Sequence, residues 1–116
     1  MSESIITKRS YNFSLDIIKL IDQLPNKKVS WIISDQLLRS ATSIGANIVE
    51  AKSSSSRKEY INYFQIALKS ANETRYWLNL LLDSGLIDKD KFDKIYTENE
   101  EICKMLASSV ITLKNK

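Results

Sequence analysis

The sequence predicts an all-α domain that folds as an antiparallel up-and-down four-helix bundle. Apolar residues recur three and four positions apart in four successive segments, which is the period of one face of an α-helix. Two glycines and one proline in 116 residues disfavour an all-β fold, which needs many tight turns. Short connections between long helices make neighbouring helices antiparallel. We therefore expect a single domain over residues 1–116, with a flexible N-terminus at residues 1–9.

The first two helices are expected at residues 10–24 and 30–52. The apolar stripe of the first consists of Phe13, Ile17, Leu20 and Leu24, and Ile18 and Ile21 widen it. Pro25 ends this helix, because proline lacks an amide proton and clashes with the preceding turn. Ser30 is the predicted N-cap of the second helix, which ends just before the serine run at residues 53–56.

The third and fourth helices are expected at residues 56–84 and 88–114. Ser56 and Glu59 have the spacing of a capping box, in which each side chain bonds to a free backbone amide near the other. Gly85 suits the left-handed position that follows a helix C-terminus. The fourth helix begins at Asp88, and its stripe includes Phe92, Ile95, Asn99, Ile102, Leu106, Ser109 and Leu113.

The second helix contains a row of short polar side chains and several very small residues. The polar row is Gln36, Ser40, Ser43, Asn47 and Glu50, and the small residues are Ala41, Gly45 and Ala46. Such a row is either a solvated face or a close polar contact with another helix, and the lack of lysine favours the contact. Glu73 lies within an apolar row of the third helix, so we expect Arg39 to pair with it. The predicted polar network is Arg39, Ser43, Asn47 and Glu73.

The third helix carries a second apolar seam beside its core stripe. The seam contains Tyr63, Ile66, Trp77 and Leu80. One interpretation is a deeply buried central helix. The other is a subunit interface, which we favour because tyrosine and tryptophan are common interface anchors. These four residues are the candidate oligomer contacts.

The composition argues against catalysis. The chain has no histidine and therefore lacks the commonest general base and the commonest metal ligand. Its single cysteine, Cys103, can form neither an intramolecular disulfide nor a cysteine metal cluster. We expect a protein that is not an enzyme and that has no catalytic residues, no metal and no cofactor. The N-terminal sequence MSESIITKRSYNFS has no long apolar segment, which favours a cytoplasmic protein without a membrane contact.

Basic residues are concentrated in the first half of the chain. Residues 1–58 contain nine lysines and arginines and five acids, whereas the net charge of the whole chain is +3. In an up-and-down bundle, the start of the first helix and the serine run lie at the same end. The candidate nucleic-acid contacts at this end are Lys8, Arg9, Lys52, Arg57 and Lys58. The alternative is that these are ordinary solvated charges.

Two stretches of the sequence resemble a known family. QLLRSATSIGANIVEA, followed by SRKEYINYFQIALKSANETRYWLNLLLDSGLI, is similar to the four-helix bundle protein family. The family is also called S23 ribosomal protein, or the protein encoded by intervening sequences in bacterial 23S rRNA genes. The matching positions are Gln36, Arg39, Ser43, Ile44, Asn47, Ile48, Glu50, Ala51, Ser70 and Glu73. This chain differs from many members at two positions: Leu38, where many have arginine, and Ala51, where the pattern has glycine or alanine and many have glycine.

The resemblance implies a homo-oligomer, and specifically a pentameric barrel of bundles. A related branch, the accessory variability determinant of diversity-generating retroelements, binds nucleic acid and a reverse transcriptase. The expected function is therefore that of an accessory protein that binds RNA or DNA. The alternative is a scaffold oligomer that binds a protein partner, such as a reverse transcriptase, without nucleic acid.

Overall fold

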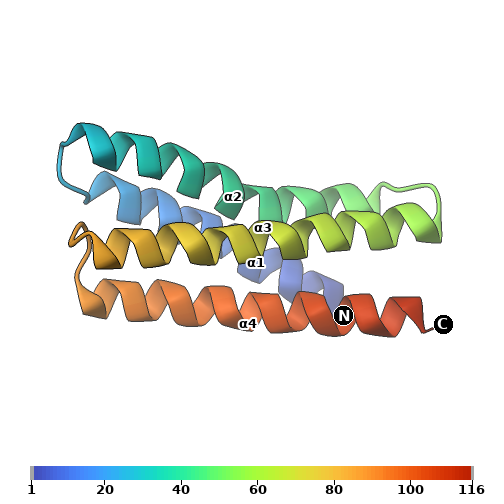
Figure 1. Cartoon of the computed structure of the whole chain (residues 1–116). Coiled ribbons are helices and arrows are strands. Elements are labelled where there is room, and N and C mark those ends of the chain that lie inside the picture. Colours follow the sequence, from blue (N-terminus) through green and yellow to red (C-terminus); the bar gives the residue numbers. More distant parts are fainter. Residues whose placement is uncertain (1, 116) are drawn as a thin grey trace.

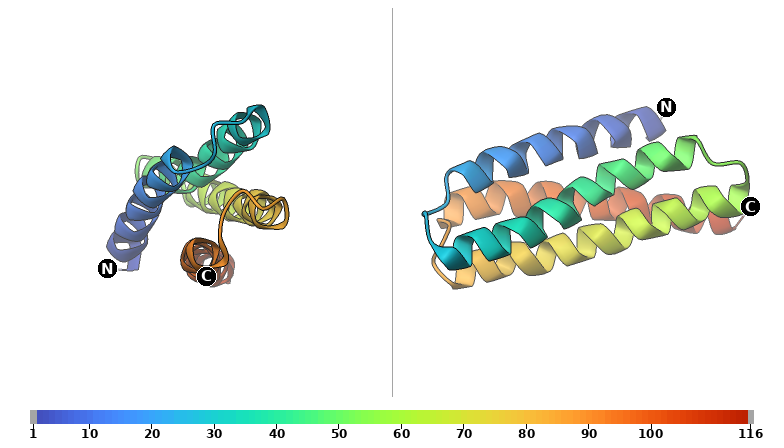
Figure 2. Two further views of the ribbon diagram at one scale, coloured as in Figure 1. Left: turned by 90° about the vertical axis from the view of Figure 1, so that its left-hand side faces the viewer. Right: turned by 90° about the horizontal axis from the view of Figure 1, so that it is seen from above.

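The structure, a computed structural model, describes the backbone of residues 2–115 and the side chains of residues 5–115. Its helices are α1 (Ser2–Asp22), α2 (Lys28–Lys52), α3 (Arg57–Asp83) and α4 (Lys89–Lys114), and residues 2–115 contain no strand (Figure 1). Successive helices run in opposite directions, so the predicted all-α antiparallel four-helix fold is confirmed (Figure 2). Both α1 and α3 contact α2 and α4, which gives the bundle a square cross-section.

The first helix begins at Ser2 rather than at Ser10, so residues 2–9 are helical where we expected a flexible segment. Met1, the rest of that expected segment, lies outside the described residues. The helix extends this far because Ile6 continues the core stripe two turns before Phe13, and Ile6 is only 2% exposed. Ser10 is fully buried within α1, and its hydroxyl donates to the Thr7 carbonyl oxygen at 3.0 Å.

The second helix also begins earlier than the sequence predicts. Lys27 occupies the N-cap position and makes no side-chain capping hydrogen bond. The predicted cap, Ser30, lies inside α2 and is 1% exposed. Its hydroxyl oxygen has no hydrogen-bond partner among the described residues. The prediction of Ser30 as N-cap is therefore wrong. Ser30 lies within the first turn of α2 and faces the core, so its hydroxyl does not cap the free amides at the helix start.

The ends of the last two helices follow the sequence closely. The Ser56 hydroxyl accepts a hydrogen bond from the Glu59 amide at 3.1 Å, and the Glu59 carboxylate accepts one from the Ser55 amide at 3.0 Å. Gly85 has a φ of 76°, the left-handed conformation expected after a helix C-terminus. The Asp88 carboxylate caps α4 by accepting from the Lys91 amide at 2.9 Å.

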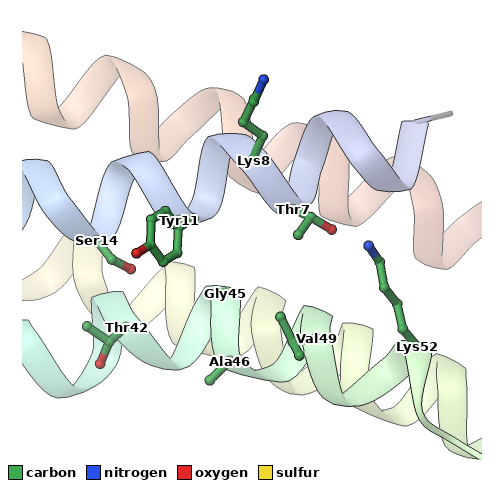
Figure 3. Close-up of a pocket in the computed structure, with 9 residues that line it drawn as sticks. All are labelled: Thr7, Lys8, Tyr11, Ser14, Thr42, Gly45, Ala46, Val49 and Lys52. Carbon is green, nitrogen blue, oxygen red and sulfur yellow. The ribbon is translucent and has the colours of Figure 1, made fainter.

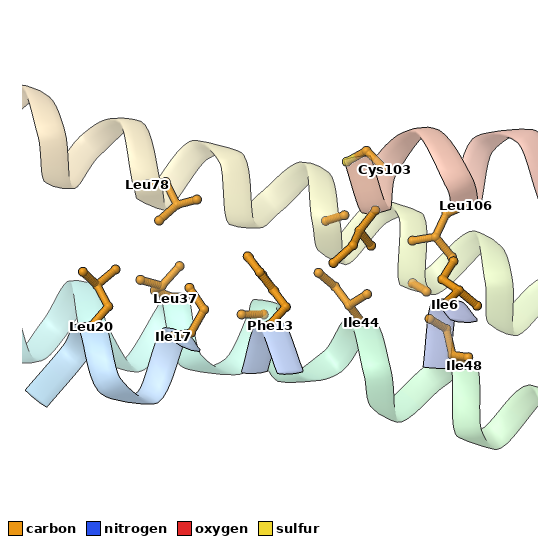
Figure 4. Packing of buried hydrophobic residues seen from close by; sticks show 14 of the residues in the cluster. Ile6, Phe13, Ile17, Leu20, Leu37, Ile44, Ile48, Leu78, Cys103 and Leu106 are labelled. Carbon is orange, nitrogen blue, oxygen red and sulfur yellow. The ribbon is translucent and has the colours of Figure 1, made fainter. Parts of the chain in front are cut away.

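All four helices contribute side chains to one apolar core (Figure 4). Phe13 and Ile17 of α1, Leu78 of α3 and Leu106 of α4 are fully buried. Ile18 was expected to widen the core stripe of the first helix, but it is 45% exposed. The apolar pattern of α1 therefore comprises two stripes, of which only one faces the core.

Candidate interaction surfaces

A ladder of short polar side chains joins α2 to α3. The hydroxyl oxygens of Ser40 and Thr74 lie 2.9 Å apart in the core, and the Ser70 hydroxyl donates to the Ser43 hydroxyl at 3.0 Å. The Asn47 amide donates to the Ser43 carbonyl and hydroxyl oxygens, at 2.8 and 2.9 Å. The structure thus brings Ser43 and Asn47 together at a helix contact, where each buried hydroxyl is satisfied.

The structure does not bring Arg39 and Glu73 together. Both side chains are exposed, and no ion pair joins them in the described part of the chain. The Glu73 carboxylate instead accepts a hydrogen bond from the indole nitrogen of Trp77 at 2.9 Å. Arg39 precedes Ser40, which faces α3, and one residue turns a helix by about 100°. Arg39 therefore lies on the outer side of α2, and the predicted pairing is wrong.

Gly45 permits a close approach between α1 and α2. A Cβ atom at this position would lie 3.2 Å from the Ser10 hydroxyl oxygen and 3.6 Å from the Ser10 Cβ. The first of these distances is shorter than an ordinary van der Waals contact. The weak helix former in the middle of α2 is therefore explained by its contact with α1.

A groove of about 640 Å³ runs between α1 and α2 on the outer side of the bundle (Figure 3). Tyr11 and Val49 form apolar parts of its wall, and Lys8 and Lys52 also line it. In Figure 3 the Lys52 side chain extends from α2 toward α1, whereas Lys8 points away from α2. These two lysines therefore border an apolar groove along the side of the bundle.

The side chain of Arg9 forms hydrogen bonds and ion pairs with acidic residues of α4. Its guanidinium donates to the two carboxylate oxygens of Glu98 at 2.6 and 3.0 Å, and to Glu101 at 2.5 Å. These hydrogen bonds to Glu98 and Glu101 raise the pKa of Arg9, because they stabilise its charged form. The candidate role of Arg9 in phosphate binding is therefore replaced by a structural one, an ionic link between α1 and α4.

Arg57 and Lys58 remain at the end of the bundle that carries the serine run, which we call the serine-loop end. An Nη atom of Arg57 donates to the Leu113 carbonyl oxygen at 2.5 Å. Lys58 and Lys114 line one hollow of about 550 Å³ at the start of α3. Lys114 was absent from the candidates, because only the fold brings the end of α4 beside the start of α3.

The seam of α3 is only half open to solvent. Tyr63 and Trp77 pack partly against the core, and Ile66 and Leu80 are each 36% exposed. A more exposed apolar surface, which we did not predict from the sequence, runs along α1 and α2. Its members are Tyr11 (66% exposed), Leu15 (41%), Ile18 (45%), Trp31 (61%) and Val49 (51%). The spacing of Tyr11, Leu15 and Ile18, by four and three residues, was the signal for it.

Cys103 is the chain's only cysteine and is buried. Burial raises the pKa of its thiol, so the thiol stays protonated and weakly nucleophilic at neutral pH. Within the described chain, no three cysteine or acidic side chains are placed to hold a metal ion. None of its helices is long and apolar enough to cross a membrane.

The sequence and the fold of this chain are similar to those of known proteins. The model of a family described as 23S rRNA-intervening sequence protein matches residues 2–108. A crystal structure at 1.70 Å resolution, of a protein with unknown function from the S23 ribosomal protein family of Bacteroides thetaiotaomicron VPI-5482, has 41% sequence identity to this chain. The match has a TM-score of 0.89 and covers 95% of this chain and 98% of that one. No curated protein matches.

Proposed function

Because the chain belongs to the 23S rRNA-intervening sequence protein family, we propose that it is a non-enzymatic, self-associating bundle that binds the phosphate backbone of RNA or DNA. The binding surface is the serine-loop end. Arg57, Lys58 and Lys114 supply its positive charge, and Lys8 and Lys52 lie nearby on the side of the bundle.

The observation that carries this proposal is the absence of ion pairs at the serine-loop end among the described residues. The side chains of Arg57, Lys58 and Lys114 are all exposed. None of the three forms an ion pair with a carboxylate of the described residues. The one acid in the hollow, Glu59, is occupied by the Ser55 amide. The positive end of the α3 dipole lies at the same place. A phosphate group would therefore meet three cations that no ion pair engages, of which Arg57 also donates to the Leu113 carbonyl oxygen.

Self-association strengthens this surface. Each copy would add its own three cations, so a ring of copies would present a repeated positive field to one nucleic acid strand. The exposed apolar side chains of α1, α2 and α3 favour such association. A count of five copies follows from the family resemblance.

The test is a titration of fluorescent mixed-sequence RNA and DNA, followed by anisotropy. For three phosphate contacts, affinity is expected to fall about 40-fold between about 50 and about 200 mM salt. In the Arg57→Ala/Lys58→Ala variant one contact remains, and the fall shrinks to about fourfold. The matched control is Lys27→Ala/Lys28→Ala, which removes the same charge at the opposite end. Absence of binding at low salt, or an equal effect of both double variants, would contradict the proposal.

A second candidate function is a scaffold that binds a protein partner, such as a reverse transcriptase, without nucleic acid. The exposed fractions of Tyr11 and Trp31, at 66% and 61%, support it, because aromatic side chains of this kind anchor protein interfaces. If this protein binds neither RNA nor DNA in the titration, the scaffold function is favoured over nucleic-acid binding.

A further inference from the structure

We infer that a hollow between the end of α1 and the start of α2 binds a primary alkylammonium group, either of a free amine or of a lysine side chain. The hollow has a volume of about 450 Å³, within the range of about 300–1,000 Å³ that is common for sites of organic ligands. It lies where α1 turns into α2, at the end of the bundle opposite the serine-loop end (Figure 1). The inference is therefore independent of the nucleic-acid surface proposed above.

A buried hydroxyl without a partner lines this hollow. Ser30 is 1% exposed, and its hydroxyl oxygen has no hydrogen-bond partner among the described residues. Ser10 and Ser40 are similarly buried, but each donates to a carbonyl oxygen three residues earlier in its own helix. Three residues before Ser30 is Lys27, the N-cap of α2, whose carbonyl oxygen accepts from the Trp31 amide. An unpaired buried hydroxyl is destabilising, so a ligand that supplies the missing hydrogen bond is favoured here.

Two carboxylates give the hollow its charge. Asp22 and Asp35 line it, both are exposed, and neither forms an ion pair with another described residue. None of the described residues that line the hollow is a lysine or an arginine. Asp22 is also the last residue of α1, where the negative end of the helix dipole makes a carboxylate unfavourable. The hollow therefore favours a cation, and a bound cation would offset the unfavourable position of Asp22.

The rest of the wall favours an organic cation over a metal ion. Ile21, Leu24 and Pro25 supply apolar contacts, and Trp31, which is 61% exposed, supplies an aromatic ring. Trp31 and Asp35 are four residues apart on α2, so they lie on the same side of the helix. An ammonium group over an indole ring is attracted by the electrons of the ring face. A primary ammonium can also donate to the unpartnered serine hydroxyl, whereas a quaternary ammonium has no hydrogen to donate.

The test is a fluorescence titration in a Trp77→Phe background, in which Trp31 is the sole tryptophan of the chain. The two ligands are pentylammonium and a lysine blocked at both backbone ends. Each should change the emission of Trp31, with a dissociation constant on the order of 1 mM for so small a ligand. The matched controls are pentanol, which has no charge, and pentyltrimethylammonium, which has no N–H group. Both should bind about tenfold more weakly than pentylammonium.

Variants of the lining residues test each contact separately. Ser30→Ala should weaken the binding of pentylammonium about tenfold and leave that of pentyltrimethylammonium unchanged. This variant loses only an unpaired hydroxyl, so it should fold as stably as its parent, which circular dichroism checks. Asp22→Asn and Asp35→Asn should each weaken binding about threefold. The matched control is Asp83→Asn, which removes the same charge from the last residue of α3, at the same end of the bundle and outside the hollow.

The outcomes either support or overturn the inference. A response to either ammonium ligand that Ser30→Ala weakens supports it, and the tighter of the two ligands identifies the source as a free amine or a lysine side chain. Unchanged emission with both ligands would overturn it, as would an equal response to pentanol or to magnesium chloride. An equal effect of Asp83→Asn and Asp22→Asn would also overturn it, because the cation would then respond to the general charge of this end. None of these outcomes depends on whether the protein binds RNA or DNA.

Discussion

Replacing Gly45 by alanine tests the close contact between α1 and α2. Alanine is favoured over glycine in a helix interior by about 1 kcal/mol. Against this gain, the new Cβ would lie 3.2 Å from the Ser10 hydroxyl oxygen, which must move by a few tenths of an ångström. The movement strains the Ser10 hydrogen bond to the Thr7 carbonyl, a bond worth about 1 kcal/mol. We expect the two effects to cancel, so Gly45→Ala should change the free energy of unfolding by less than about 0.5 kcal/mol.

The Ser10→Ala background isolates the contact. Without the hydroxyl, the nearest Ser10 atoms to the new Cβ are the Cβ at 3.6 Å and the carbonyl carbon at 3.7 Å, both ordinary van der Waals distances. In this background Gly45→Ala should therefore stabilise the protein by about 1 kcal/mol, the full helix propensity gain. The coupling energy of the double-mutant cycle is then about 1 kcal/mol.

The assay is urea unfolding followed by circular dichroism at one fixed protein concentration, because the self-association proposed above would make stability depend on concentration. The close contact with α1 also predicts that Gly45→Val, whose side chain has two more methyl groups than alanine, is destabilising in both backgrounds. The reasoning is refuted if Gly45→Ala has the same effect with and without the Ser10 hydroxyl.

Two further predictions concern ionisable groups. Arg9→Ala should lower stability by about 1 kcal/mol, since the ion pair with Glu98 is about one-third exposed, and the loss should shrink in high salt while RNA affinity is unchanged. Lys19→Ala, with the same charge change, is its control; a larger effect of Lys19→Ala would count against the α1–α4 link. Because burial raises the pKa of Cys103, the folded state holds the thiol proton more tightly. Its contribution to stability is full below the ordinary pKa of about 8.5 and is lost as pH rises through the raised value. Unfolding curves across alkaline pH should therefore decline more for wild type than for Cys103→Ala, and equal declines would contradict this.

The helices and most of their ends were determined by the sequence locally. The caps at Ser56 and Asp88 and the turn at Gly85 depend on residues within four positions of one another, so the chain needs no tertiary context to specify them. The spacing of core residues by three and four positions is also visible in the sequence, and it correctly places Asn99 in the core stripe of α4, where the side chain is buried. Its amide donates to the Ala71 carbonyl oxygen at 3.0 Å.

The tertiary structure decided which apolar stripes are covered and which charges meet. Ile17 and Ile18 are adjacent in the sequence, yet one is fully buried and the other is 45% exposed, because the rotation of α1 about its axis is set by packing against α2 and α4. Arg9 and Glu98 form an ion pair although they are 89 positions apart in the sequence. Arg39 and Glu73, also an arginine and a glutamate, do not contact each other. Periodicity along one helix carries no information about the neighbouring helix. The choice of ionic partners and of exposed faces therefore depended on how four helices rotate and align in the bundle.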